Sequence, residues 1–319
     1  MRILYLDNLL TLLMFKQPQY RKHEGKTIAR VDDYSVIDCL HCKFKHVWPF
    51  PTPEALSALY QQSYYTDVYP LAAEISESEI ESSRRDCRKR LDDLESRIPV
   101  GRRKLLDVGA GNFGFLYVAR ERGWDVVGIE PSEQGKSRAQ ALNIPFIYGT
   151  FSPEAIAGRG PFDLIHLNCV LEHLLDPITL VQASYESLAP GGILSVCVPN
   201  DFNPLQHAFV ESQDANPWWV SPLQHINYFN TKTLPRMLES MGFEIEDSEV
   251  TFPIEFFLLF GDDYVNNPSL GSDCHQKISR FEENMKKTGQ AELLKQMYAS
   301  FEQLGIGRRL LLTARKPQY

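Results

Sequence analysis

The sequence predicts an α/β protein built on a doubly wound, mostly parallel sheet with helices on both faces. From residue 104 onward, short apolar runs alternate with helix-like stretches such as 113–122 and 132–142. Strand–helix alternation of this kind is typical of parallel sheets. The runs are continuously apolar, as strands covered on both faces require. A chain of 319 residues is also long enough to bury a sizeable core.

Seven segments are expected to form strands of this sheet. Five of them are the apolar runs KLLDVG, DVVGIE, PFIYGT, FDLIHLN and GILSVCVP. A sixth strand is predicted at 243–250 (FEIEDSEV), and the last one, RRLLLTARK, begins near residue 308. The insertion between the last two is longer than a plain connection, and its apolar residues recur at helical spacing.

These features divide the chain into four parts. We expect an N-terminal accessory module at 1–70, a helical linker at 71–103, a core formed by 104–252 with 307–319, and a helical cap insertion at 253–306. The linker is charged and has few apolar positions, which predicts a mostly exposed helix. We expect the cap to lie over the ligand-binding side of the core.

Composition narrows the class of protein. A formal net charge of −8 argues against a nucleic-acid-binding protein, which would need a basic surface for phosphate contacts. No run of about 18 apolar residues is present, so no membrane-spanning helix is expected. The apolar stretch at 9–15 lacks the flanking features of a signal peptide. Most of the six cysteines are scattered, as in a protein with reduced thiols, so a cytoplasmic location is expected.

The strongest motif is LLDVGAGNFG at 105–114. Its glycines Gly109, Gly111 and Gly114 fit the pattern G-x-G-x-x-G between a strand and a helix. The first allows a sharp turn, the second lets a ligand approach the backbone, and the third eases packing of the helix. Alone, the motif would fit a dinucleotide site equally well.

Two carboxylates refine the interpretation. Glu130 closes the next strand, where a carboxylate can accept hydrogen bonds from both ribose hydroxyls. Asp107 precedes the first glycine by two residues, where it would repel a pyrophosphate but favour a ligand carrying an ammonium and a sulfonium. This pattern indicates S-adenosylmethionine. The alternative for Asp107 is a strand-end residue that bonds its own turn.

The sequence resembles the class I S-adenosylmethionine-dependent methyltransferases, within their small-molecule group. The resemblance covers about 104–250 and lies in LLDVGAGNFG, GIEPS, YGTF, FDLIHLNCVLEHLLDP, LAPGGILSVCVPN and HINYFNTKTLPRMLESMGFEI, in that order. It implies a seven-stranded, Rossmann-like sheet with an antiparallel last strand. It also implies methyl transfer from S-adenosylmethionine to a small-molecule or carrier-linked acceptor, with a sugar or polysaccharide precursor as our first hypothesis.

The resemblance places the methionine part of the cofactor against Gly109, Ala110 and Gly111. Asn168 and Val170, at the end of the fourth strand, should border the methionine and the transferring methyl group. For Val170 the alternative is ordinary core packing.

The same comparison places the nucleoside part of the cofactor further along the sheet. Glu130 should bind the ribose, with Pro131 and Ser132 beside it, and Thr150 and Phe151 should flank the adenine. Many relatives have an acidic residue near the adenine amino group, whereas this chain has Gly-Thr-Phe there. That contact would fall to a backbone carbonyl, and the alternative for Thr150 and Phe151 is packing alone.

Methyl transfer depends mainly on alignment of the reacting atoms, and a general base is needed only when the acceptor must lose a proton. His225, in PLQHINYFN, is a candidate base because histidine titrates near neutral pH. His173, beside Glu172 in the LEH segment, is a second candidate. The alternative for both histidines is a structural role in the loops.

The pair Cys39 and Cys42 has the spacing of half a zinc knuckle. Some relatives carry two such pairs, but here the second is missing, and His23, His41 or His46 would have to replace it at unconvincing spacing. We therefore expect no metal site. Two other functions remain open, a non-catalytic S-adenosylmethionine-binding module and a nicotinamide-dependent oxidoreductase, as do the acceptor atom and the oligomeric state.

Overall fold

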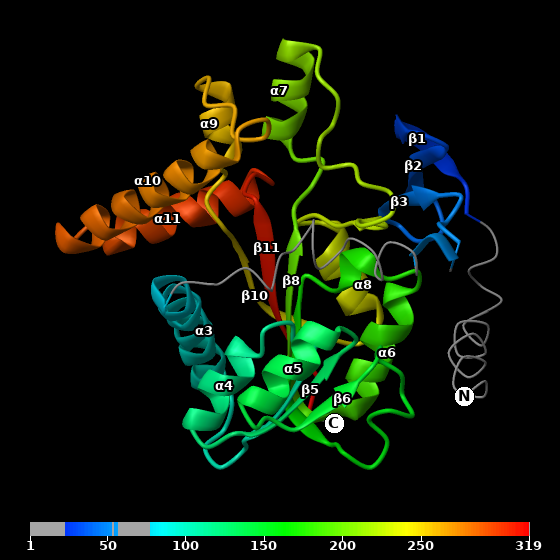
Figure 1. Ribbon diagram of the computed structural model, residues 1–319, viewed down its shortest axis with the longest axis vertical. Coiled ribbons are helices and arrows are strands. Elements are labelled where there is room, and N and C mark those ends of the chain that lie inside the picture. Colours follow the sequence, from blue (N-terminus) through cyan, green and yellow to red (C-terminus); the bar gives the residue numbers. More distant parts are fainter. Residues whose placement is uncertain (1–22, 53, 57–76, 319) are drawn as a thin grey trace.

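The computed structural model describes residues 23–52, 54–56 and 77–318 (Figure 1). A seven-stranded sheet forms its centre, in the order β10-β11-β8-β7-β4-β5-β6. These strands are β4 (Lys104–Val108), β5 (Asp125–Glu130), β6 (Phe146–Tyr148), β7 (Phe162–Asn168), β8 (Leu188–Pro199), β10 (Glu244–Val250) and β11 (Arg309–Arg315).

The pairing of the strands confirms the predicted fold class. Strands β6, β5, β4, β7 and β8 pair in parallel, and β11 runs antiparallel to both of its neighbours, β8 and β10. The two central strands are covered on both sides, since Leu105, Leu106, Leu164 and Ile165 have no exposed surface. The parallel strands end at one edge of the sheet, called the carboxyl edge below.

Helices connect the strands and cover both faces of the sheet (Figure 1). Several begin at a side chain that accepts a hydrogen bond from the first helical turn, namely Ser132, Asp176 and Asn203. They are α4 (Gly114–Glu121), α5 (Glu133–Ala141), the short 3₁₀ helix η3 (Leu171–His173), α6 (Pro177–Ser187), α7 (Pro204–Gln213) and α8 (Thr233–Ser240).

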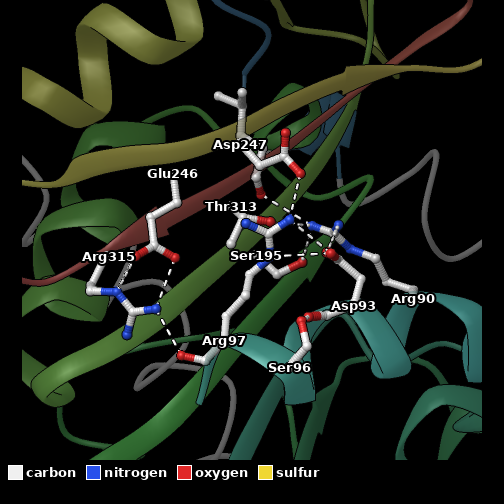
Figure 2. Close-up of polar contacts among 10 residues, drawn as sticks. Arg90, Asp93, Ser96, Arg97, Ser195, Glu246, Asp247, Thr313 and Arg315 are labelled. Carbon is white, nitrogen blue, oxygen red and sulfur yellow. Dashed lines mark hydrogen bonds and ion pairs between the residues drawn. The ribbon is translucent and has the colours of Figure 1, made fainter. Parts of the chain in front are cut away.

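The helix before the sheet, α3 (Glu77–Arg97), is more buried than the sequence predicts. Leu91 and Leu94 have no exposed surface, because α3 packs against α4 and the sheet. Arg90 lies on the same side of the helix and reaches the sheet, where its guanidinium donates to Ser195 Oγ at 3.0 Å and Thr313 Oγ1 at 3.1 Å (Figure 2). A charged side chain therefore occupies a core position, which conceals the apolar periodicity of this helix.

We expect Arg90→Met to lower the free energy of unfolding by about 2 to 4 kcal/mol, because two buried hydroxyls lose a charged donor. Chemical denaturation of the purified protein measures this loss. Arg85→Met is the matched control, since Arg85 lies on the same helix with an exposed side chain. Equal stability of the two variants would contradict a structural role for the buried guanidinium.

The segment between β10 and β11 contains three helices and begins and ends at the carboxyl edge. This follows from the strand directions, because β10 ends there and the antiparallel β11 starts there. Phe252 contacts the rings of Phe281 and Phe301, and α9 packs against α7. The helices are α9 (Glu255–Leu259), α10 (Pro268–Lys287) and α11 (Ala291–Gln303).

A second, four-stranded sheet lies near the same edge (Figure 1). It combines three N-terminal strands with a short strand from the core, and β3 pairs with β9 through His46 opposite Asn227. Val47 of β3 and Tyr228 of β9 are both buried. None of the helices that the structure describes is long and apolar enough to cross a membrane. The strands are β1 (Gly25–Val31), β2 (Tyr34–Cys39), β3 (Lys45–Trp48) and β9 (Asn227–Tyr228).

Candidate active site

The turn after β4 has the backbone shape that its glycines allow. Gly109 has φ 71° and Gly111 has φ 52°, both in the left-handed region. A Cβ atom on Gly109 would lie 2.7 Å from Val170 Cγ2, so the turn approaches the segment after β7 closely. A Cβ atom on Gly111 would meet no described atom nearer than 3.9 Å. The backbone at Gly111 therefore faces open space, where a ligand can approach.

Glu130 links this turn to the end of β5. Its carboxylate is buried, with Oε2 accepting from the Gly111 N–H at 2.9 Å and Oε1 from the Ser132 N–H at 3.0 Å. The Ser132 hydroxyl is occupied as the cap of α5. Gly135 was not singled out by the sequence, yet a Cβ there would lie 2.2 Å from Glu130 Cγ.

The other expected cofactor residues gather at the same edge. They follow the carboxyl ends of the adjacent strands β4, β5, β6 and β7, where ligands of such sheets bind. Pro131, Thr150 and Asn168 are exposed, whereas Phe151 and Val170 are half-buried against the core. Ala110 is buried, and its N–H donates to the carbonyl of Ile129.

Asp107 has a partner that the sequence does not predict. Its Oδ1 lies 2.9 Å from Nδ1 of His166, which is the opposing residue on β7. The His166 ring stacks on Phe115 of α4 at 4.1 Å between centroids. Both polar side chains are almost fully buried. His166 thus holds the Asp107 carboxylate within the sheet, and a contact between Asp107 and the cofactor stays a prediction.

A group of acidic and histidine side chains lies next to the glycine turn after β4. Val170, which the turn approaches, is followed directly by η3, where Glu172 and His173 lie. The rings of His173 and His225 are 5.2 Å apart, and the Ile226 N–H donates to the Glu172 carbonyl. The structure therefore brings both candidate bases together, within one short helix of Val170.

The two histidines are oriented differently. Nδ1 of His173 donates to the Gln224 carbonyl at 2.6 Å, and burial lowers the pKa of His173. Nδ1 of His225 lies 3.5 Å from Oδ2 of Asp201. The Glu172 carboxylate is buried and has no hydrogen-bond partner among the described residues. Ligand atoms of Glu172, His173 and His225 lie within 4.8 Å of one another, so they could also hold a metal ion.

Asp201 was not predicted from the sequence as a site residue, although it directly follows the VPN segment at the end of β8. Burial by itself would raise its pKa, but the Arg308 guanidinium and hydrogen bonds from His225 and Gln206 lower it to about 2. Asp201 is therefore ionised at neutral pH. It holds Arg308 on one oxygen and faces His225 with the other.

The lowered pKa of Asp201 predicts a pH-dependent contribution to stability. Because the folded pKa lies below the unfolded one, the contribution of about 2 kcal/mol is complete above pH ~4 and disappears as the pH falls toward 2. Asp201→Asn should therefore destabilise the protein at pH 6, with the difference from wild type shrinking near pH 3. Denaturant unfolding at both pH values measures it, and the exposed Asp214→Asn variant is the control. A difference that does not change with pH would contradict this assignment.

Comparison with known proteins bears on these observations. A family model described as a methyltransferase domain matches residues 80–248. Trans-aconitate 2-methyltransferase of Methylobacterium radiotolerans is 31% identical over 139 residues, which cover 41% of this chain and 52% of that protein. A ubiquinone biosynthesis O-methyltransferase of Cereibacter sphaeroides is 32% identical over 122 residues, covering 36% and 49%. The chain spans about half the length of the curated relatives it matches.

Among solved structures, phospholethanolamine N-methyltransferase 2 of Haemonchus contortus is similar with a TM-score of 0.51. The match covers 96% of this chain and 74% of that one at 16% sequence identity. At this level of identity the similarity supports the fold alone.

Proposed function

The chain belongs to the S-adenosylmethionine-dependent methyltransferases, and we propose that it transfers a methyl group from S-adenosylmethionine to a small-molecule or carrier-linked acceptor. The observation that carries this proposal is the open backbone at Gly111, hydrogen-bonded to the buried Glu130. The family assignment disfavours the nicotinamide-dependent alternative.

The residues at the carboxyl edge fit the cofactor. Gly109, Ala110 and Gly111 would hold its methionine part, and the carboxylate of Glu130, which the turn and the start of α5 orient, would accept from the ribose hydroxyls. Asn168 is exposed at the end of β7 and offers a polar side chain beside the turn. When bound, S-adenosylmethionine supplies an electrophilic methyl group on a positively charged sulfur.

The remaining cofactor residues have supporting roles in this proposal. Thr150 and Phe151 would border the adenine, and Val170 would lie beside the methyl group, since it already touches the turn. Pro131 and Ser132 would hold the loop under the ribose, the serine through its cap on α5.

His225 is the proposed general base. Asp201 is ionised and lies beside Nδ1 of His225, which favours a proton on that nitrogen and leaves Nε2 to accept one. An acceptor hydroxyl would pass its proton to Nε2 as its oxygen bonds to the methyl carbon and the carbon–sulfur bond breaks. His173, in ring contact, would act as a positioning residue that sets the orientation of His225.

We propose a hydroxyl-bearing acceptor, with a sugar or polysaccharide precursor as the first candidate. The names of two relatives support small-molecule acceptors, trans-aconitate in one case and O-methylation in ubiquinone biosynthesis in the other. The helices α9 to α11 and the N-terminal sheet both lie at the edge that would bind the acceptor. Such surroundings suit an acceptor larger than the core alone could enclose.

Calorimetric titration and a product assay test the proposal together. We expect S-adenosylmethionine and S-adenosylhomocysteine to bind and NADH not to bind. Release of S-adenosylhomocysteine with a panel of sugars, nucleotide sugars, organic acids and quinone precursors would then identify the acceptor class. If neither S-adenosylmethionine nor S-adenosylhomocysteine binds the folded protein, the proposal that this chain uses S-adenosylmethionine is wrong. Binding without turnover on any acceptor would favour a non-catalytic binding module.

A further inference from the structure

Four potential metal ligands meet at one end of the N-terminal sheet. Nδ1 of His23 lies 3.1 Å from Nε2 of His46, 3.5 Å from Sγ of Cys42 and 3.9 Å from Sγ of Cys39. One ligand atom from each of the four residues lies within 4.8 Å of the other three. The two cysteines form no disulfide. We call these four residues the Cys/His cluster.

The strand pairing explains how residues distant in sequence come together. β1 runs antiparallel to β2 with Gly25 opposite Cys39, so His23 arrives beside the cysteine pair. A Cβ on Gly25 would lie 2.0 Å from the Asp38 carbonyl oxygen, so this close approach needs a glycine. β3 then returns along β2 and brings His46 to the same end. The spacing between His23 and the cysteines therefore follows from a hairpin and not from a knuckle motif.

The distances match a tetrahedral zinc site. With zinc–sulfur bonds of about 2.3 Å and zinc–nitrogen bonds of about 2.0 Å, the edges of the tetrahedron measure about 3.3 Å between nitrogens and about 3.5 Å between nitrogen and sulfur. The corresponding separations are 3.1 Å between nitrogens, and 3.5 and 3.9 Å between nitrogen and sulfur. Two thiolates and two imidazoles are also ligands that select zinc by their chemistry.

The surroundings orient the ligands as a metal site requires. Nδ1 of His46 donates to the Val47 carbonyl at 2.8 Å, which leaves the Nε2 lone pair directed toward His23. His46 is fully buried. The Cys42 N–H points to Cys39 Sγ at 3.5 Å, and Lys43 holds the following turn with φ 63°.

We propose that His23, Cys39, Cys42 and His46 bind one structural zinc ion. All four positions come from the protein, so the ion would have no open site for a substrate. Binding at neutral pH forms two zinc–thiolate and two zinc–imidazole bonds and releases the two thiol protons to solvent. This proposal replaces the expectation of a metal-free module and does not depend on the methyltransferase activity.

The ion would also fix a part of the candidate active site. His46 lies opposite Asn227 on β9, and the Val47 N–H donates to the Ile226 carbonyl. The side-chain amide of Asn227 donates to the carbonyls of Leu171 and Leu174, which flank the segment with Glu172 and His173. Zinc in the cluster would hold β3 in place and thereby support β9, which begins two residues after His225.

Metal analysis of the purified, reduced full-length protein tests the proposal. We expect about one zinc ion per chain by elemental mass spectrometry, falling to less than about a tenth in Cys42→Ser and in His46→Ala. His41→Ala is the matched control, because His41 lies between the two cysteines with an exposed side chain and outside the cluster. The control should retain its zinc. Loss in the control, or no zinc in the wild type even after adding zinc sulfate, would overturn the proposal.

Measurements on the wild-type chain avoid the risk that a variant fails to fold. Replacing zinc by Co²⁺ should give visible absorption bands with a thiolate charge-transfer band, as expected for tetrahedral sulfur and nitrogen ligands. Chelation should lower the melting temperature, and zinc should restore it. If Co²⁺ gives no thiolate band, and both thiols react freely with a thiol reagent before and after zinc addition, the cluster is only a histidine pair hydrogen-bonded beside two free cysteines.

Discussion

Replacing His225 by alanine is expected to lower the turnover number by roughly two to four orders of magnitude, with little change in affinity for S-adenosylmethionine. The imidazole lies beside an ionised, buried carboxylate, and its ring contacts His173. Removing it deletes the proposed proton acceptor while the glycine turn stays intact. Turnover by release of S-adenosylhomocysteine and affinity by calorimetry separate the two effects.

His207→Ala is the control for this variant, since His207 is an exposed histidine on the helix after β8. It should leave turnover near the wild-type value. Normal turnover by the His225 variant would exclude this residue from proton transfer and would favour an acceptor that needs no base.

Replacing Gly111 by valine is expected to weaken S-adenosylmethionine binding at least about 100-fold, or by about 2.8 kcal/mol. The nearest described atom to the Cβ position at Gly111 is Gly109 O, at 3.9 Å. The valine methyl groups would therefore occupy the space where the ligand approaches. Calorimetric or fluorescence titration with S-adenosylmethionine and S-adenosylhomocysteine measures the loss.

Backbone strain must be separated from this steric effect, because valine is unfavourable at φ 52°. Gly123→Val provides the control, since Gly123 has φ 84°, no described atom within 4 Å of its Cβ position and a place in the turn before β5. Both variants should lose stability to a similar extent, and only the first should lose affinity. Unchanged affinity in Gly111→Val would show that the ligand does not approach this turn.

The sheet was predictable because each of its strands has a recognisable pattern within its own short stretch of sequence. Continuous apolar runs such as LLDV and FDLIHL mark strands buried on both faces, and glycine and carboxylate positions mark their ends. The antiparallel last strand came with the family resemblance and is confirmed by the pairing of β11 with β8. The expected site residues follow directly, because the ends of adjacent parallel strands must lie side by side.

Contacts that depend on tertiary register were not predictable. Asp107 meets His166 only because β4 and β7 pair in one particular register. Arg90 occupies a buried position that an apolar residue would normally mark, so the helix looks exposed in sequence. The Cys/His cluster depends on a hairpin register, since Gly25 must face Cys39 before His23 can reach it. No spacing rule along the chain contains that information.

The segment that carries α9 to α11 leaves and re-enters the sheet at neighbouring positions, with Val250 opposite Leu310. A loop closed across a paired hairpin can grow or shrink during evolution at little entropic cost, because closure entropy rises only slowly with length. The paired strands β10 and β11 keep their register whatever the length of the segment between them. Homologous chains can thus diverge in the segment that would meet the acceptor while inheriting unchanged the strand ends that would bind the nucleoside.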